Sequence, residues 1–314
     1  MRIALVCDDL TQHGGHEKVI LDICRIFPEA PLYTTLATKK WQNICQREGI
    51  ELKTTCLQKI PFKKKLNRAL APFLLHIFAL ERLNFDQYDL VISISSRFAH
   101  GIIVKPQTKH VCYMSTVGRM FWEPATYFEH ESFGGFKLFK ILAKVFLRLP
   151  LSYIRLWDRI AAQRVDYFIA NSKMTQKRIK KYYGRGAKII HPAIDIKEFS
   201  SAEKIDPEDF YLVLTRLSPW KRVDLAVEAC LNTGDSLNIA GSGPDVARLK
   251  KIAGDSENIE FLGYVSEKEK VKLLERCKAL INTQFEDFGL VPLEAMACGR
   301  PVIAYKKGGV LETI

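Results

Sequence analysis

The carboxyl-terminal part of the sequence alternates short apolar runs with helix-length segments, and this alternation restricts the possible fold more than any other feature. Apolar runs of five or six residues bounded by turn formers are typical of buried strands. Strands that alternate with helices form βαβ units around a parallel sheet. We therefore expect an α/β domain of the doubly wound, Rossmann-like kind. The runs span residues 210–215, 236–240, 258–262, 279–283 and 301–305.

The amino-terminal part shows the same kind of pattern. Ser172 is suited to cap a helix over residues 173–182, which follows the last of four apolar runs. These runs predict the strands of a first parallel sheet. They span residues 1–6, 89–96, 109–114 and 167–172.

Length and composition favour two domains. A chain of 314 residues with 47% hydrophobic content can bury two separate cores. The polar run 195–209 is the predicted boundary between them. We therefore expect an N-terminal domain of residues 1–196 and a C-terminal domain of residues 197–314.

Two carboxylates flank a glycine turn after the fourth carboxyl-terminal run. Glu286 and Glu294 have seven residues between them. Gly289 permits a tight turn, and Pro292 suits the first position of a short helix over residues 292–298. The two carboxylates are therefore expected on the loop and in the first turn of that helix.

This arrangement indicates a class of ligand. The backbone N–H groups of residues 290–293 are expected to be free at the helix start, which favours an anion such as a phosphate ester. Carboxylates beside it accept hydrogen bonds from hydroxyl groups, so a phosphate joined to a polyol fits the stretch. Two ordinary readings remain open: Glu294 as a partner of the helix dipole and Glu286 as a solvated loop residue.

The whole stretch closely resembles the Glu-x7-Glu signature of glycosyltransferase family 4, and Phe-Gly-Leu and Leu-Glu-Ala-Met-Ala-Cys-Gly-Arg-Pro-Val agree as well. The resemblance implies two Rossmann-like domains facing across a cleft, the GT-B architecture, and sugar transfer with retention of configuration. It also implies that Glu286 contacts the hydroxyls of the donor sugar and Glu294 the ribose. The other implied donor-binding residues of this stretch are Phe288, Gly289, Leu290 and Val291.

Three glycine-bearing turns extend the resemblance. Gly14 and Gly15 lie in Gly-Gly-His-Glu, which matches a Gly-Gly-x-Glu turn whose backbone approaches the donor phosphate in the family. Gly241, Gly243 and Gly263 follow two further predicted strands, where the family's turns surround the nucleotide. Taken alone, each turn also fits a tight connection that binds nothing.

A basic turn follows the first strand of the C-terminal domain. Arg216 and Lys221 occupy the places where the family has an Arg and a Lys that grip the donor diphosphate. Cations fixed at that point stabilise the charge that develops on the leaving group. The resemblance thus implies catalytic roles for Arg216, Lys221 and Glu286.

One segment departs from the family pattern. The family segment Tyr-x-His-Ser/Thr-Pro-x-Arg-x-x-Trp is matched at Tyr113, Thr116, Arg119 and Trp122, but its histidine is replaced by Ser115. Ser115 and Arg119 are the expected acceptor-side residues. Arg119 fits an acceptor phosphate and equally a packed ion pair with Glu123.

Charge predicts an anionic partner. The formal net charge is +12, from 47 Lys and Arg against 35 Asp and Glu. Basic and apolar residues are segregated at helical spacing within 61–85 and 137–149, which fits helices on an anionic membrane and, as well, domain helices with solvated lysines. The basic positions are Lys63, Lys64, Lys65, Arg68, Lys137, Lys140, Lys144 and Arg148.

Other patterns point away from competing classes. No Asp-x-Asp pair or zinc-type spacing occurs, so we expect no metal and no cofactor beyond a nucleotide-sugar substrate. No nucleic-acid-binding motif is present. The scattered cysteines suggest reduced thiols in a cytoplasmic protein. The longest apolar run, 70–80, contains Pro72 and His76 and cannot span a bilayer.

Together these features predict a metal-independent retaining hexosyltransferase, similar to family members that build bacterial polysaccharides and the O-antigen of lipopolysaccharide with mannose. We expect a mannose-type or glucose-type donor, a glycan or lipid-linked acceptor, and peripheral attachment at the inner face of the plasma membrane. The alternative is a catalytically impaired nucleotide-sugar-binding or partner protein. The chain stops within what resembles a further loop and helix, so its C-terminal domain is expected to be truncated.

Overall fold

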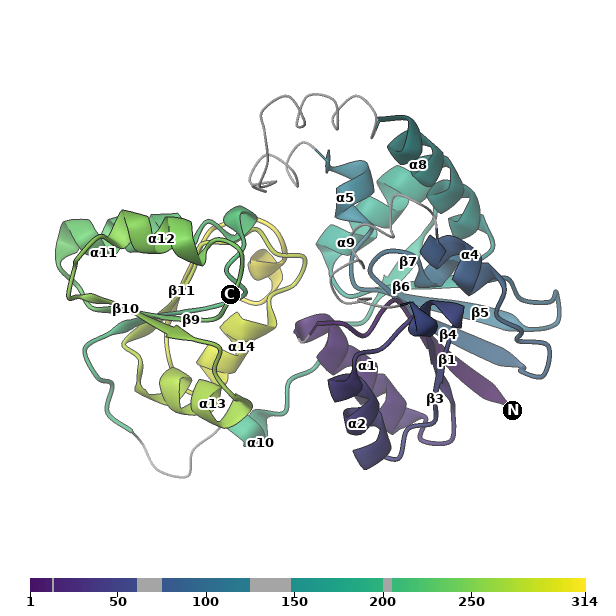
Figure 1. The fold of residues 1–314 in the computed structure, drawn as a ribbon, viewed down its shortest axis with the longest axis horizontal. Helices are drawn as coiled ribbons and strands as arrows, with labels where there is room; N and C mark the ends of the chain where they lie inside the picture. Colours follow the sequence, from purple (N-terminus) through teal and green to yellow (C-terminus); the bar gives the residue numbers. More distant parts are fainter. Residues whose placement is uncertain (13, 61–74, 125–147, 200–204) are drawn as a thin grey trace. The chain divides into compact units, whose positions relative to one another are not determined.

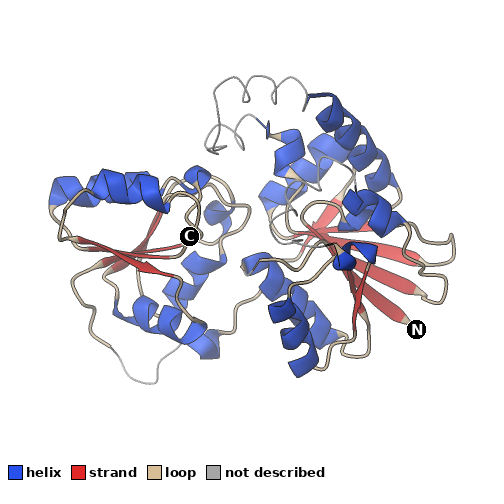
Figure 2. Ribbon diagram, viewed as in Figure 1, coloured by secondary structure: helices blue, strands red, loops and turns tan. Residues whose placement is uncertain are grey.

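The computed structural model describes residues 1–12, 14–60, 75–124, 148–199 and 205–314 (Figure 1). The described residues form two compact units. Of the described residues, unit 1 contains 1–124 and 148–191, with the gaps named above, and unit 2 contains those from Pro192 to Ile314. Each unit is a parallel sheet with helices on both faces (Figure 2). The expected α/β class with two Rossmann-like sheets is confirmed.

Unit 1 contains a seven-stranded parallel sheet in the order β3-β2-β1-β4-β5-β6-β7. Strand order reverses between β1 and β4, so the connections that leave these neighbours run to opposite sides. The strands are β1 (Ile3–Cys7), β2 (Leu32–Thr34), β3 (Leu52–Thr54), β4 (Leu90–Ser95), β5 (Lys109–Met114), β6 (Tyr167–Ala170) and β7 (Ala187–Ile189).

Alternate residues of β1 feed the two cores of unit 1. Leu5 and Cys7 pack with α1 and α2, whereas Ala4 and Val6 belong to the cluster that includes α4, α5 and α8. This alternation follows from the two-residue period of a strand. The helices of unit 1 are α1 (Gly15–Ile26), α2 (Lys39–Arg47), α4 (Leu75–Glu81), α5 (Arg119–Trp122), α8 (Arg148–Gln163) and α9 (Lys173–Arg178), with turns η1 (Cys56–Lys59), η2 (Ala99–Gly101) and η3 (Ile179–Tyr183).

Unit 2 contains a five-stranded parallel sheet in the order β10-β9-β8-β11-β12, with its reversal between β8 and β11. One face packs on α11 and α12 and the other on α10, α13 and α14. The elements are α10 (Ile196–Phe199), β8 (Tyr211–Leu214), η4 (Pro219–Lys221), α11 (Val223–Thr233), β9 (Leu237–Ala240), α12 (Val246–Ala253), β10 (Ile259–Gly263), α13 (Glu267–Arg276), β11 (Ala279–Asn282), α14 (Leu290–Ala297), β12 (Val302–Ala304) and η5 (Gly309–Glu312).

The nine strands predicted from apolar runs are all present, and Ser172 caps α9 by accepting a hydrogen bond from the N–H of Thr175 at 3.1 Å. The regular α-helix ends at Arg178, earlier than predicted, and continues as the π-helical turn η3. Strands β2, β3 and β7 were not predicted, because three residues are too few to show a period; β12 is equally short but lies within the longer apolar run 301–305.

The structure describes only part of the segments that were predicted to contact a membrane. Most of the basic positions within 61–85 and 137–149 lie outside the described residues. Within the described part of the chain, no helix combines the length and apolar character needed to cross a bilayer.

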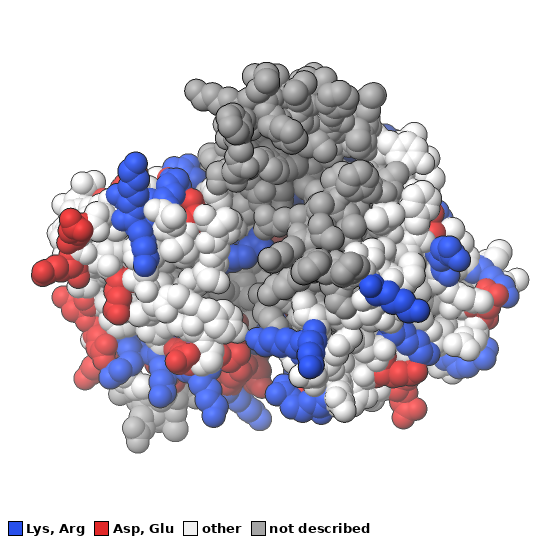
Figure 3. Space-filling model, in the orientation of Figure 1, with Lys and Arg blue, Asp and Glu red and all other residues white. Residues whose placement is uncertain are grey.

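All eight cysteines lie among the described residues and none forms a disulfide. Lys and Arg are interspersed with Asp and Glu on the face drawn in Figure 3.

Candidate functional site

The reversal point of the unit 2 sheet brings two predicted site residues into contact. Lys221 follows β8 and Glu286 follows β11, and these strands are neighbours. Lys221 Nζ lies 3.0 Å from Glu286 Oε1, and the side chains are only 12% and 16% exposed. Residues 65 positions apart in the sequence therefore form one mostly buried ion pair at the edge where doubly wound sheets bind ligands.

The backbone around Lys221 is tightly held. Lys221 ends the 3-10 turn η4, and Arg222 follows in the left-handed region with φ of 54°. Thr283 Oγ1 donates a hydrogen bond to the carbonyl of Lys221 at 2.9 Å, and the ammonium lies 4.3 Å from the ring centroid of Trp220. Arg216 leaves the same strand with an exposed side chain. The two predicted phosphate-binding cations thus share one connection.

The second predicted carboxylate, Glu294, is buried in α14 and pairs with another lysine. Lys270 Nζ on α13 lies 3.2 Å from Glu294 Oε1 and 2.6 Å from Glu267 Oε2. Burial by itself lowers the pKa of Lys270, but the two carboxylates outweigh burial and raise it. Lys270 was missed from the sequence, because nothing distinguishes it from the other charged residues of α13 until the fold brings that helix against α14.

Helix α14 begins earlier than expected and has fewer free N–H donors in its first turn. The helix begins at Leu290, two residues before the predicted start, with Gly289 as its cap at φ of 98°. The N–H groups of Leu290 and Val291 lie in the first turn, where the helix offers no acceptor. Pro292 has no N–H, so the expected row of free donors over residues 290–293 is wrong at that position.

Glu286 is positioned by its own backbone as well as by Lys221. Its carbonyl accepts a hydrogen bond from the N–H of Gly309 at 2.8 Å, and Glu286 forms an isolated parallel bridge with Gly308. A Cβ atom added to Gly309 would overlap the backbone of Phe288. The loop after β12 therefore packs on the loop that carries Glu286, and Phe288 is buried between helix and loop.

Gly241 and Gly243 have a structural requirement of their own. A Cβ atom at Gly241 would overlap the carbonyl oxygen of Thr215, and one at Gly243 would overlap that of Leu217. The N–H of Gly241 also donates to the carbonyl of Gly263 at 2.7 Å. These glycines allow the turn after β9 to pack against the turn after β8, so close packing by itself explains their presence.

Unit 1 has a polar cluster at its own reversal point, between β1 and β4. The Asp8 carboxylate accepts hydrogen bonds from the backbone N–H groups of Ser96, Arg97, Phe98 and Ala99 at 2.6 to 3.0 Å. Burial by itself raises the pKa of Asp8, but Arg97, His16 and these N–H groups lower it overall. Asp8 thus fastens the turn after β4 to the end of β1.

The Gly14-Gly15 turn leads into α1, which begins at Gly15 with Gly14 in extended conformation. In the first turn of α1, His16 Nδ1 lies 2.8 Å from Ser115 Oγ. Ser115 follows β5, and its N–H donates to the carbonyl of Ser95 at 2.9 Å. His16 was not selected from the sequence, because its partner is 99 residues away.

The other expected acceptor-side residue, Arg119, lies in α5. Its Nε is 3.9 Å from Glu123 Oε2, so the packed ion pair exists but is long. Glu123 is held more closely by Arg178, whose Nε and Nη2 donate to its two carboxylate oxygens at 3.0 and 3.1 Å. One carboxylate is therefore shared between two guanidinium groups.

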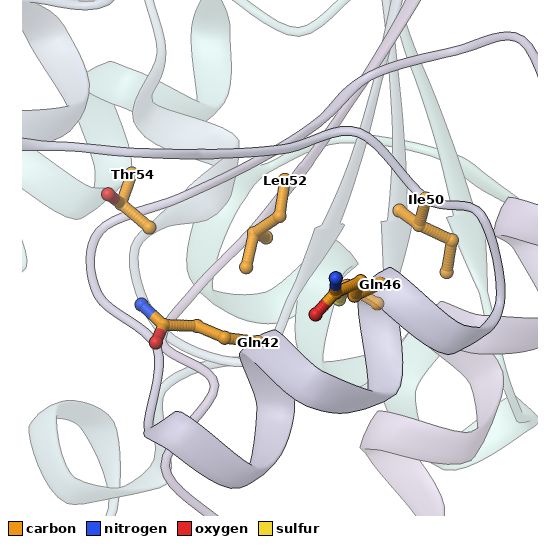
Figure 4. A pocket seen from close by; sticks show the side chains of 6 residues that line it. Gln42, Gln46, Ile50, Leu52 and Thr54 are labelled. Carbon is orange, nitrogen blue, oxygen red and sulfur yellow. The ribbon is translucent and has the colours of Figure 1, made fainter.

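A surface groove elsewhere in unit 1 does not coincide with any of these residues. It has a volume of about 320 Å³ and lies between α2 and the edge strand β3 (Figure 4). Its lining carries no formally charged side chain that would hold a phosphate. The lining residues are Gln42, Cys45, Gln46, Ile50, Leu52 and Thr54. Among the described residues, no group of three or more His, Cys, Asp or Glu side chains is arranged to hold a metal ion.

Two family models match the chain. The model described as Glycosyltransferase Family 4 matches residues 13–198, and the model described as Glycosyl transferases group 1 matches residues 195–314. The Saccharomyces cerevisiae alpha-1,3/1,6-mannosyltransferase ALG2 is 28% identical in an alignment of 225 residues that covers 55% of this chain and 44% of the yeast protein. The human protein of the same name is 29% identical in an alignment of 201 residues that covers 53% of this chain and 48% of that protein. The chain thus spans about half the length of these relatives.

Solved structures with the same fold include Anabaena Alr3699/HepE in complex with UDP, with a TM-score of 0.69 and 19% identity over all of this chain and 83% of that one. The glycosyltransferase WaaG, involved in lipopolysaccharide biosynthesis, has a TM-score of 0.65 and 15% identity, with 99% of this chain and 83% of that one covered. At these identities the likeness establishes the fold of the chain.

Proposed function

Because this chain belongs to glycosyltransferase family 4, we propose that it transfers a hexosyl group from a nucleotide-diphosphate sugar to a glycan or lipid-linked acceptor, with retention of configuration. The observation that carries the proposal is the contact of Lys221 Nζ with Glu286 Oε1 at the reversal point of the unit 2 sheet. A cation and a carboxylate at one strand edge suit a ligand that has both phosphate and hydroxyl groups.

In the proposed mechanism, the donor diphosphate competes with Glu286 for the ammonium of Lys221. Arg216 and the first N–H groups of α14 add positive potential on the same side of unit 2. As the bond from the sugar to the diphosphate breaks, negative charge grows on the leaving group, and these fixed donors stabilise the transition state more than the ground state.

Release of Lys221 leaves Glu286 free to accept hydrogen bonds from the hydroxyls of the sugar. Glu294 stays paired with Lys270 and has the ribose hydroxyls as its proposed ligands. Gly289 keeps the backbone open beside Glu286, because a Cβ atom there would lie 3.0 Å from Glu286 Oε2. No side-chain carboxylate is assigned as a nucleophile, so the leaving phosphate is the proposed base for the acceptor hydroxyl.

The sugar and the location are further parts of the proposal. A mannose-type or glucose-type donor is supported by the yeast relative, named as a mannosyltransferase, and by the Anabaena structure in complex with UDP-glucose. Attachment to the cytoplasmic face of a membrane is supported by the net charge of +12 and by the segregated basic positions. Each basic residue near an anionic surface contributes roughly 1 kcal/mol. We expect binding at low salt to vesicles of phosphatidylglycerol but not of phosphatidylcholine. Equal binding to both would refute this part.

The activity is tested by incubating the protein with GDP-mannose, UDP-glucose and UDP-N-acetylglucosamine and measuring release of nucleoside diphosphate. The assay is run with and without n-octyl α-mannoside and n-octyl β-glucoside as acceptor probes. Release from at least one donor supports the transferase. Calorimetric binding of a donor without any release supports the alternative, a catalytically impaired nucleotide-sugar-binding protein.

A further inference from the structure

An imidazole and a hydroxyl meet above the centre of the unit 1 sheet. His16 lies in the first turn of α1, the helix that follows β1, and Ser115 directly follows β5. Strand β4 lies between β1 and β5. His16 Nδ1 and Ser115 Oγ are 2.8 Å apart. The contact therefore bridges the carboxyl ends of three neighbouring strands, at the edge where doubly wound sheets bind ligands.

The second nitrogen of the ring is the informative atom. His16 Nε2 is buried and has no hydrogen-bond partner among the described residues. Buried polar atoms in native proteins almost always have a partner, and a lone one calls for an explanation. Since Ser115 occupies Nδ1 and thereby fixes the ring, Nε2 is the atom left to bind something else.

The polar residues around His16 are themselves held in place by hydrogen bonds. The Asp8 carboxylate is close enough for His16 to be one of the causes that lower its pKa, and Asp8 is itself held by four backbone N–H groups. Ser115 is fastened to β4 by its own N–H and accepts a hydrogen bond from Thr175 Oγ1 at its carbonyl, at 3.3 Å. The imidazole thus stands on a rigid support.

We propose that His16 binds a hydroxyl group of a sugar substrate through Nε2, and that Ser115 is the positioning residue that orients the ring. This inference rests on the proposed glycosyl transfer. The hydroxyl belongs either to the transferred hexosyl group or to the acceptor sugar, which have the same hydrogen-bonding chemistry. The contact partner of His16, Ser115, is the residue that replaces the histidine of the family pattern.

Two substitutions separate this role from a structural one. His16→Gln keeps an amide near the position of Nε2, whereas His16→Asn keeps one near Nδ1 and so preserves only the contact with Ser115. If Nε2 binds substrate, H16Q retains activity within about threefold, and H16N and H16A lose about tenfold in kcat/KM, the loss expected for one hydrogen bond. The reverse order, with H16N active and H16Q inactive, would show a structural role and overturn the proposal.

The two sources of the hydroxyl are distinguished by running the donor alone and with n-octyl α-mannoside. A hydroxyl on the transferred sugar predicts that H16A slows release of nucleoside diphosphate in both arms. A hydroxyl on the acceptor predicts that release without acceptor is unchanged and that the KM for the octyl mannoside rises. Ser115→Ala is expected to lower activity under the same assay condition as H16A, either with the donor alone or with the octyl mannoside. The double variant is expected to lose no more activity than H16A.

Controls keep this inference separate from the proposed function. Lys39→Gln changes an exposed side chain in the first turn of α2 in the same unit, and it is expected to leave kcat/KM and thermal stability unchanged. Calorimetric titration of each variant with the donor and with the octyl mannoside gives a readout that needs no turnover. If the wild type is active and H16A is equally active, the proposed role of His16 is refuted, while the proposed transferase activity stands. A wild type that neither binds nor turns over any donor would refute the transferase.

Discussion

Replacing Lys221 with alanine separates the stability of unit 2 from the proposed chemistry. At 3.0 Å the ion pair with Glu286 has a gross Coulomb energy of about 5 kcal/mol at an effective dielectric constant of about 20. Both side chains are mostly buried, and the substitution leaves the Glu286 carboxylate without its cation, so the expected loss of stability is about 3 kcal/mol. A loss of that size lowers the melting temperature of a unit of this size by about 12 °C, and the folded fraction must be checked at the assay temperature.

The expected effect of Lys221→Ala on the reaction is much larger. Loss of one fixed donor to a charge that develops in the transition state costs about 2.7 to 4 kcal/mol, or about 10²- to 10³-fold in kcat. The assay is the release of nucleoside diphosphate at saturating donor, with the folded fraction measured by circular dichroism on the same sample. Unfolding cannot produce a loss of this size while the melting temperature stays well above the assay temperature.

Lys278→Ala is a control outside the candidate site, because it also breaks a lysine–carboxylate pair of unit 2, although a more exposed one. Lys278 Nζ lies 3.1 Å from Asp209 Oδ1, and neither residue is part of the candidate site. The control is expected to keep its rate within about twofold. A Lys221→Ala variant that retains a third or more of the wild-type rate, or a Lys278→Ala variant that loses as much as Lys221→Ala, would refute the assignment of Lys221 to the leaving group.

Three other predictions concern the fold and the reaction conditions. Gly243→Ala, whose Cβ atom would overlap the carbonyl of Leu217, is expected to destabilise unit 2 by about 3 kcal/mol or more in urea unfolding, and a loss under 1 kcal/mol would contradict the packing described. The lowered pKa of Asp8 contributes stability that is present above the unfolded value of about 3.9 and lost as the pH falls through the folded value. Asp8→Asn should therefore weaken the dependence of the unfolding free energy on pH below about 4, and an unchanged slope would argue against it. Finally, we expect EDTA to leave the rate of diphosphate release unchanged, and restoration of a lost rate by Mg²⁺ or Mn²⁺ would disprove metal independence.

The sequence predicted the elements whose local signals are strong. The five strands of unit 2 lie in the predicted, mainly apolar runs, of which two are interrupted by Asn238 and Glu260, and the cap at Ser172 has its hydrogen bond as expected. Strands β2, β3 and β7 have three residues each and show no pattern of their own, whereas the equally short β12 lies within the apolar run 301–305. Helix α14 begins two residues before its predicted start, because Gly289 supplies the left-handed turn that precedes the helix. Pro292 therefore lies inside the first turn.

The candidate site was predictable only in part. Glu286 and Lys221 were both assigned to the donor site, and the strand order adds that their side chains are in direct contact. Lys270 and His16 were missed because each acquires its meaning from a partner on another element, Glu294 and Ser115 respectively. Local patterns indicate which residue types suit a chemistry, whereas contacts between distant strand ends are set by sheet topology.

A crystal structure of the protein with the nucleotide sugar that gives the highest diphosphate release would locate the phosphates directly. We expect a phosphate oxygen within hydrogen-bond distance of Lys221 Nζ, with Glu286 turned from the lysine to the hydroxyls of the sugar. Phosphates bound away from the ends of β8 and β11, with the Lys221–Glu286 ion pair still closed, would contradict the proposed site.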